Sequence, residues 1–177
     1  MTRSSSLITR TGPTRIGRII RCLSFWVLAL ALATSSANAQ DKNLLVVIVG
    51  PKTPLDQVSI KELRDLYLGN VTAIQGVSLK PVNFSANSQE RLTFEKLVLL
   101  MTSDQFTEHW RTKRFLNTFQ KQPSVFKSAQ AVRSFVSDEP GTMGYIPLSD
   151  VDPTVRAVRK VDGHDLADKA YPLRINP

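Results

Sequence analysis

The sequence predicts an α/β fold in which a mixed sheet is flanked by helices. Short runs typical of strands alternate with amphipathic helical segments from residue 44 to residue 161. This order is typical of α/β sandwiches whose sheet is partly parallel. The same region contains no internal repeat, no low-complexity tract and no long linker, so residues 40–177 are predicted to form one domain.

Residues 1–39 are predicted to be a secretory signal peptide. The segment has five arginines and no acidic residue, and the apolar run Leu23–Ala33 and the triplet Ala37-Asn38-Ala39 follow. This is the order of a basic region, an apolar region and an A-x-A cleavage site, so we expect cleavage after Ala39 and a periplasmic protein. The apolar run is shorter than the roughly 20 residues of a membrane-spanning helix, which disfavours the alternative of a membrane anchor.

The predicted mature segment is mildly basic and has no cysteine. It keeps 18 of the 23 Lys and Arg residues against all 15 Asp and Glu residues. This balance suits an anionic small ligand or an acidic surface and requires neither. The only cysteine, Cys22, lies within the signal peptide. Packing rather than disulfides must therefore stabilise the domain, and zinc sites built on thiolates are excluded.

The first strand and the first helix have clear sequence signals. Leu44–Gly50 (LLVVIVG) is a continuous, largely β-branched run, as in buried strands of sheets covered on both faces. Ser59 and Glu62 have the spacing of a capping box. A helix is therefore predicted over residues 60–67, ended by Gly69-Asn70.

The next segments are predicted as a turn or small hairpin, a second strand and a second helix. The turn or hairpin covers residues 71–78. The strand is Leu79–Phe84, in which Pro81 indicates a sheet edge or a strand end. The helix presents an apolar face because Phe94, Leu97, Val98 and Met101 recur at helical spacing.

Two further helices are predicted in the second half of the domain. Thr102 and Gln105 have capping-box spacing, and Phe106 and Trp110 follow four residues apart. After a loop over residues 120–123, the apolar residues of the segment 132–136 indicate another helix, which Pro140-Gly141 ends.

Two strands are predicted near the C-terminal end. Met143–Pro147 (MGYIP) is typical of a short buried strand. Val155–Val161 (VRAVRKV) mixes apolar and basic residues in a way that predicts a half-exposed strand.

Catalysis, metal binding and nucleic-acid binding find little support in the motifs. There is no thiol in residues 40–177 and no G-x-S-x-G elbow, HEXXH, EF-hand or Walker spacing. His109 is expected to pack on a helix, and His164 to lie in a solvated polar loop. A basic cluster at residues 111–114 is expected to be a solvated helix face rather than a nucleic-acid site. We therefore predict no enzyme, no cofactor, no metal and no nucleic-acid partner.

The best candidate for a binding site is the stretch SANSQERLTF, Ser85–Phe94. A helix N-terminus offers unpaired N–H groups and partial positive charge. The predicted ligand is a small oxyanion bound by Ser88, Arg91 and the N–H groups of Gln89 and Glu90. Asn87 and Ser85 are expected to assist. Membrane contact is expected only through the cleaved signal peptide.

A second interpretation of the same stretch is a plain helix cap. Asn87 would then be the N-cap, Glu90 would complete a capping box, and Arg91 would be solvated. Glu90 favours this interpretation, because a carboxylate in the first turn competes with an incoming anion.

The series of segments resembles the periplasmic phosphate-binding proteins of ABC transporters, and more closely their short, single-lobe relatives. The matching pieces are VVIVGPKTPLDQVSIKELRDLYLGN, LKPVNFSANSQERLTF, Trp110 with Phe115, and PGTMGYIP. They cover residues 44–161 in order. The resemblance implies one lobe of a type II periplasmic-binding-protein fold, a phosphate-like ligand and no catalysis.

In that family, a Ser-Gly-Thr motif at a helix N-terminus, preceded by arginine and aspartate, binds phosphate. Here Ser88 falls on the serine, whereas Gln89 and Glu90 replace glycine and threonine. Phe84 and Ala86 replace the arginine and aspartate. Arg91, three residues before Phe94, instead fits the R-x-x-F pattern of the short relatives.

Two hypotheses follow from this partial match. In the first, the domain is an exported oxyanion-binding module that would serve phosphate transport or sensing. In the second, it is an envelope protein–protein interaction module that keeps the fold but has lost phosphate binding, and it uses the exposed cleft or the surface from Trp110 to Phe119.

Overall fold

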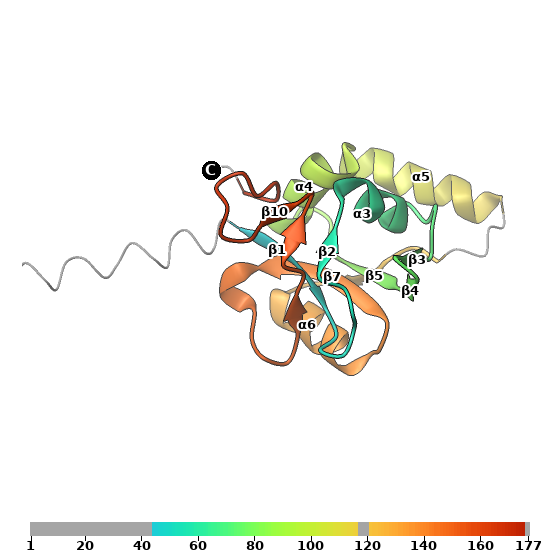
Figure 1. Ribbon diagram of the computed structural model, residues 1–177. Coiled ribbons are helices and arrows are strands. Elements are labelled where there is room, and N and C mark those ends of the chain that lie inside the picture. Colours follow the sequence, from blue (N-terminus) through green and yellow to red (C-terminus); the bar gives the residue numbers. More distant parts are fainter. Residues whose placement is uncertain (1–43, 117–120, 176–177) are drawn as a thin grey trace, which may run out of the picture. The chain divides into compact units, whose positions relative to one another are not determined.

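A computed structural model describes residues 44–116 and 121–175. The predicted signal peptide and its cleavage site lie outside the described residues. Figure 1 shows the elements in their places. In chain order they are β1 (Leu45–Val49), β2 (Gln57–Val58), α3 (Ile60–Tyr67), β3 (Ala73–Ile74), β4 (Val77–Ser78), β5 (Lys80–Phe84), α4 (Gln89–Phe94), the π-helix η2 (Glu95–Leu99), α5 (Ser103–Phe115), β6 (Ser124–Phe126), α6 (Ala129–Asp138), β7 (Thr142–Pro147), the 3₁₀ turn η3 (Leu148–Asp150), β8 (Arg156–Ala157), β9 (Lys160–Val161) and β10 (His164–Asp165).

The main sheet is mixed, as predicted, and has the strand order β6-β5-β7-β1-β8. β1 is antiparallel to β7 and β8, whereas β5 is parallel to β6 and β7. Every residue of β1 and β7 is buried, which confirms both predictions of buried strands. Pro81 lies near the start of β5, where the pairing with β6 has not yet begun, so it marks a strand end rather than a sheet edge.

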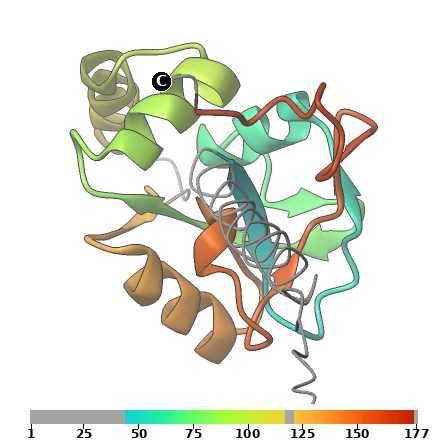
Figure 2. The same cartoon turned by 90° about the vertical axis from the view of Figure 1, so that its left-hand side faces the viewer.

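Helices cover both faces of this sheet (Figures 1 and 2). α6 lies on one face, and α3 and α4 lie on the other (Figure 2). β7 contacts the helices on both faces, because successive side chains of a strand point to opposite faces of the sheet. Gly144 lies against Val132 and Val136 of α6. The ring of Tyr145 stacks on Phe94 of α4 at 4.0 Å between centroids, with the planes 2° apart.

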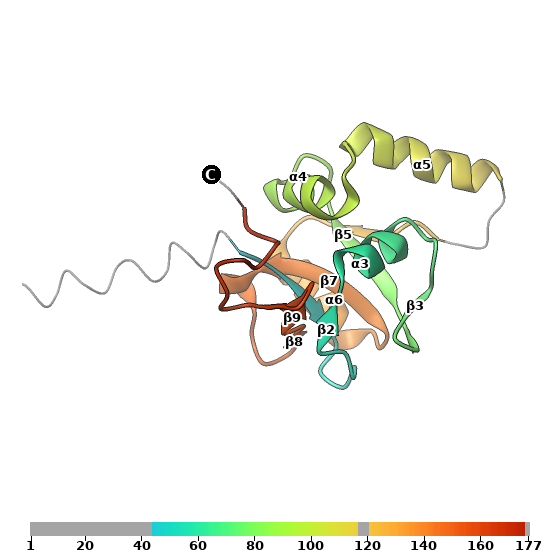
Figure 3. The ribbon, with the colours of Figure 1, turned by 45° about the horizontal axis from the view of Figure 1, so that its top comes forward.

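The predicted capping boxes of α3 and α5 are both confirmed. Ser59 and Glu62 exchange both expected bonds, and so do Thr102 and Gln105. Figure 3 shows α5 lying beside α3 and extending beyond the sheet. Its buried side chains are Phe106 and Trp110, as the spacing predicted. Its far end is open to solvent, because Phe115 is 89% exposed.

The helix predicted around Phe94–Met101 has a form that the sequence did not indicate. It is an α-helix only to Phe94 and then continues as the π-helix η2. The segment ends at Leu100, a non-glycine residue with the left-handed φ of 55°. Because that conformation is sparsely populated by such residues, Leu100 is held there by its surroundings.

The C-terminal segment packs against the N-terminal part of the domain. β9 pairs in parallel with β2 and forms a hairpin with β10. The hairpin turn at Asp162-Gly163 has positive φ at both residues. The Asp162 carboxylate accepts the Ile60 N–H at 2.8 Å. The first turn of α3 is therefore completed by a residue 102 positions further along the chain.

One expectation about strands is corrected, and one short strand was missed. The single strand predicted over Val155–Val161 is two short strands in different sheets, since β8 pairs with β1 and β9 pairs with β2. Val155, Val158 and Val161 are all buried, a spacing of three that no regular strand has. β6 was not predicted, because it has three residues, two of them exposed. Residues 71–78 do contain a hairpin, β3–β4.

No helix in residues 44–116 and 121–175 has the length and apolar character needed to cross a membrane.

The closest packing between the sheet and α6 gives a first prediction. A Cβ added at Gly144 would lie 2.8 Å from methyl carbons of Val132 and Val82. Gly144→Ala is therefore expected to lower the free energy of unfolding by about 1–3 kcal/mol, the usual cost of overpacking. Urea denaturation measures this cost.

The double variant Gly144→Ala with Val82→Ala separates a clash from other effects. Removing the Val82 methyl groups relieves one of the two 2.8 Å contacts, while the contact with Val132 remains. The double variant should therefore be more stable than the sum of the two single costs implies. Additive costs, or an unchanged Gly144→Ala protein, would contradict the packing explanation.

Candidate functional site

The predicted ligand corner lies where β5 ends and α4 begins. Ser88 is the N-cap of α4, with extended backbone angles, and its hydroxyl accepts the Arg91 N–H at 3.2 Å. The turn before it is closed by the Ser88 N–H, which donates to the Ser85 carbonyl at 3.3 Å. Ser88 therefore occupies the helix-start position that the resemblance assigned to it.

Asn87 is not the N-cap, so the alternative cap interpretation was wrong in its residue. Its φ is 68°, in the left-handed region that asparagine tolerates better than most residues. Its side chain is exposed beside the first turn. The alternative was right that a polar side chain caps the helix, but the cap lies one residue later.

Ser85 ties the corner to the neighbouring strand. Its N–H and its hydroxyl both donate to the Phe126 carbonyl in β6, at 2.8 Å and 3.2 Å. The Ser85 hydroxyl proton is thereby directed at the backbone. This structural contact explains the presence of a serine at position 85 without a ligand.

Arg91 is the main correction to the predicted site. Its side chain is 5% exposed and forms an ion pair with Glu95, 2.7 Å from Nε to Oε1. Nη1 donates to the Phe84 carbonyl at 3.0 Å, and the guanidinium lies 5.2 Å from the centre of the Phe106 ring. One interpretation of the sequence made Arg91 a donor to the ligand and the other left it solvated, whereas the structure places its side chain in the interior.

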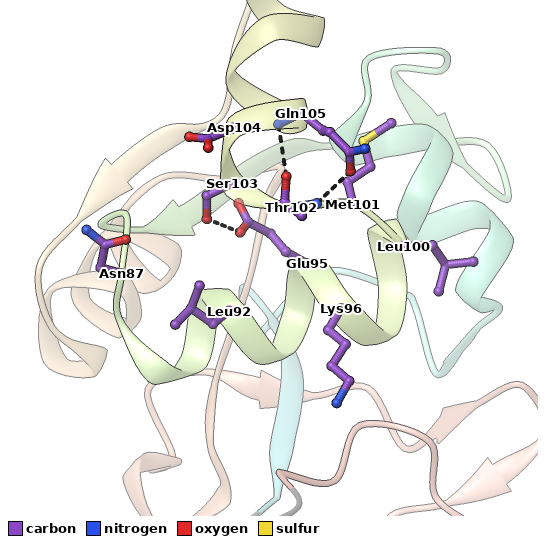
Figure 4. Close-up of a pocket in the computed structure, with 10 residues that line it drawn as sticks. All are labelled: Asn87, Leu92, Glu95, Lys96, Leu100, Met101, Thr102, Ser103, Asp104 and Gln105. Atoms are coloured by element: carbon purple, nitrogen blue, oxygen red, sulfur yellow. Dashed lines mark hydrogen bonds between the residues drawn. The ribbon is translucent and has the colours of Figure 1, made fainter.

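The partner carboxylate connects this corner to α5. The side chain of Glu95 is 2% exposed, and Glu95 also accepts a short hydrogen bond from the Ser103 hydroxyl (Figure 4). A buried charge is tolerated when it is paired and hydrogen-bonded. Arg91 and Glu95 satisfy each other here and so join β5, α4, η2 and α5.

Aromatic rings form the floor of the corner. Tyr145 lies between Phe84, at 5.4 Å between ring centroids, and Phe94. Its hydroxyl donates to the Asn83 side chain in a short bond. Burial raises the pKa of the Tyr145 phenol far above its usual value, so the phenol stays neutral and acts as a hydrogen-bond donor.

The groups left for a ligand at the corner are few. The Ser88 hydroxyl can still donate its proton, and the first-turn N–H groups of Gln89 and Glu90 have no acceptor within the helix. The carboxylate of Glu90 lies in the same first turn. The corner therefore offers neutral donors with one acidic side chain beside them.

A groove borders the other side of α4 and η2 (Figure 4). Its volume is about 750 Å³. The walls come from α4 and η2 on one side and from the start of α5 on the other. The lining residues are Asn87, Leu92, Glu95, Lys96, Leu100, Met101, Thr102, Ser103, Asp104 and Gln105. Leu100 is 67% exposed and Leu92 is 43% exposed, so the rim is partly apolar.

No feature of the sequence indicated this groove. The run RLTFEKLVLL has helical spacing throughout, and nothing in it marks the change to a π-helix. π-Helical turns are rare and are often found at functional sites.

The remaining candidate residues have structural contacts. His109 contacts the Leu68 carbonyl at 2.9 Å, and His164 contacts Asp168 at 3.1 Å. In the basic cluster, Arg111 pairs with Glu108 on the surface. The Lys113 ammonium bonds the carbonyl that follows α3, and partial burial lowers its pKa. Among residues 44–116 and 121–175, no cluster of three or more His, Cys, Asp or Glu could hold a metal ion.

Comparison with solved structures identifies the fold. The chain matches a structure assigned to a phosphate ABC transporter substrate-binding protein with bound phosphate from Clostridium perfringens, at a TM-score of 0.59 and 19% identity, over 73% of this chain and 51% of that one. It matches an ABC-type phosphate transport receptor from Vibrio cholerae at a TM-score of 0.59 and 21% identity, over 73% and 53%. PstS from Borrelia burgdorferi gives 0.58 and 16%, over 75% and 55%.

These matches define a class of fold, that of the substrate-binding proteins of phosphate ABC transporters. The chain spans about half the length of the structures it matches, consistent with a single lobe. The fold resemblance predicted from the sequence is thereby confirmed. No family model matches the sequence.

The buried ion pair gives a second prediction. Glu95→Gln leaves the Arg91 charge buried without its partner, and removing one member of a buried pair costs about 3–5 kcal/mol. The expected result is a large fall in the free energy of unfolding, measured by denaturant titration.

Glu108→Gln is the matched control. Glu108 forms an ion pair with Arg111 in which both side chains are more than half exposed, and such pairs contribute about 1 kcal/mol at most. Equal losses of unfolding free energy in the two variants would mean that the Arg91–Glu95 pair does not stabilise the corner.

Proposed function

We propose that this chain is an exported solute-binding domain that recognises a small, phosphate-like oxyanion at the N-terminus of α4, in the periplasm. The observation that carries the proposal is that Ser88 caps α4, because the resemblance aligns Ser88 with the serine of the family's phosphate motif. The fold match to a protein with bound phosphate supports the same ligand class. The proposed role is binding without catalysis, in phosphate transport or sensing.

The proposed contacts differ from those expected from the sequence. The Ser88 hydroxyl and the N–H groups of Gln89 and Glu90 would contact the anion, with help from the Asn87 amide. Arg91 does not contact the anion and instead positions the helix, because Glu95 neutralises its charge. Binding at this corner is therefore expected to be weak unless a partner surface covers it, since exposed charge contacts are screened by water and salt.

Calorimetry with phosphate and sulfate tests this proposal. Ser88→Ala removes the hydroxyl and should abolish the part of the binding heat that comes from this corner. It should also lower the free energy of unfolding by about 1 kcal/mol through the lost cap. Folded wild-type protein that gives no heat with millimolar phosphate or sulfate would refute the proposal.

Ser128→Ala is the matched control for the loss of a cap. Ser128 is the N-cap of α6, and its hydroxyl accepts the Ala131 N–H at 3.2 Å, as Ser88 does for α4. The two variants should lose similar stability, but only Ser88→Ala should lose anion binding. Equal loss of binding in both would mean that the effect comes from destabilisation.

A second candidate function is protein–protein interaction within the envelope. The observation that favours it is Leu100, an exposed leucine held in the left-handed conformation at the rim of the groove. Backbone strain of this kind gathers at binding sites and switch regions. The engagement of Arg91 by Glu95 also favours it, because that pairing removes the strongest anion donor from the corner.

The double variant Leu92→Ser with Leu100→Asn tests this candidate, because asparagine tolerates the left-handed φ. Protein captured from an envelope extract and identified by mass spectrometry should be lost from this variant. Val71→Asn removes a comparably exposed apolar side chain elsewhere and should keep the partner. If both variants capture the partner as wild-type protein does, the groove is not the interaction surface.

A further inference from the structure

A small cavity lies on the flank of α4 and η2, away from the Ser88 hydroxyl. Its volume is about 130 Å³, and it is lined by Gln89, Leu92, Thr93, Lys96, Leu97 and Arg174. It is thus formed where the C-terminal segment passes beside the helix. A cavity of this size suits one small group, since drug-sized ligands occupy about 300–1,000 Å³.

The cavity brings together two cations that come from distant parts of the chain. Lys96 has no hydrogen bond or ion pair with any residue in the described part of the chain. Figure 4 shows its side chain extending away from α5, on the side opposite Ser103. The lysine therefore points away from the Glu95 carboxylate, and its charge is not neutralised by a direct contact.

Arg174 is held in place by hydrogen bonds to backbone carbonyls, and its charge also lowers the pKa of the nearby Asp168 carboxylate. Its Nε donates to the Lys169 carbonyl at 3.2 Å, and Nη2 donates to the Asp168 carbonyl at 2.8 Å. The Asp168 carboxylate itself contacts His164 and the Ala170 N–H. These bonds fix the plane of the guanidinium, and at most two of its five N–H groups are used.

The other polar lining groups can also donate. The side chain of Gln89 is exposed at the start of α4, and Thr93 is 8% exposed and supplies a hydroxyl. None of the lining residues is acidic. Two cations with neutral donors and no carboxylate form a donor set suited to an oxyanion.

We propose that this cavity binds a phosphate-type oxyanion, either free or as the headgroup of an anionic lipid. The site is distinct from the Ser88 corner, because its charge comes from Lys96 and Arg174 and does not depend on the cap of α4. Leu92 and Leu97 flank it, so a phosphate attached to a larger apolar body can also enter from the solvent side.

Two binding measurements on the purified protein distinguish the two sources. Calorimetry with inorganic phosphate measures binding of the free anion. Co-sedimentation with vesicles of phosphatidylcholine containing phosphatidylglycerol, compared with phosphatidylcholine alone, reports the headgroup. Binding in either measurement, weakened about tenfold in Lys96→Gln and in Arg174→Gln, is the expected result, because hydrogen bonds to charged groups are strong.

Lys52→Gln is the matched control, because Lys52 is an exposed lysine in the turn after β1 and the variant loses the same charge. It should bind as wild type does. Lys96→Gln is the decisive variant, since Lys96 has no contact in the described residues whose loss would unfold the protein. Binding that all three variants weaken equally would show a response to net charge and overturn the proposal.

Two other results also overturn it. One is no binding in either measurement. The other is phosphate binding that Ser88→Ala abolishes while Lys96→Gln and Arg174→Gln leave it unchanged. That last result would still support the proposed function at the α4 corner, so the two proposals can fail separately.

Discussion

The ion pair between Arg91 and Glu95 is the contact on which the corner between β5 and α4 depends. It joins the end of β5, through the Phe84 carbonyl, to α4 and η2, and through Ser103 to α5. Both charges are removed from water, which is costly unless each is paired. The pair therefore helps to fix the arrangement of these elements, together with the buried side chains of Phe106 and Trp110 in α5.

The same pair decides how the corner can recognise a ligand. A guanidinium at a helix N-terminus would make a strong, charge-assisted anion site, but here the guanidinium is occupied internally. What the corner retains is a capped helix start with neutral donors. The charges that remain available on this helix lie on its flank, where Lys96 faces the C-terminal segment. A fold used by phosphate-transport proteins can thus carry its cationic groups at a different place.

Much of the fold was predictable because its signals are local. The capping boxes at Ser59 and Thr102, the β-branched run of β1 and the helical spacing of Phe106 and Trp110 each depend on residues close in sequence. The interior position of Arg91 was not predictable in this way. It depends on Phe106 and the Phe84 carbonyl, which only the tertiary structure brings to it. The π-helix and the split strand at residues 155–161 were missed for a similar reason, since packing against distant elements sets them.

The closure of the first helix by Asp162 has a consequence for the order of folding. The N-terminal strands pair with the C-terminal end: β1 with β7 and β8, and β2 with β9. Such non-local contacts slow folding, because the chain loses the entropy of closing long loops before the stabilising contacts form. The domain cannot complete its sheet or the cap of α3 until nearly all of its chain is available. A polypeptide with this topology is therefore expected to reach its native state only after its last strands have left the ribosome.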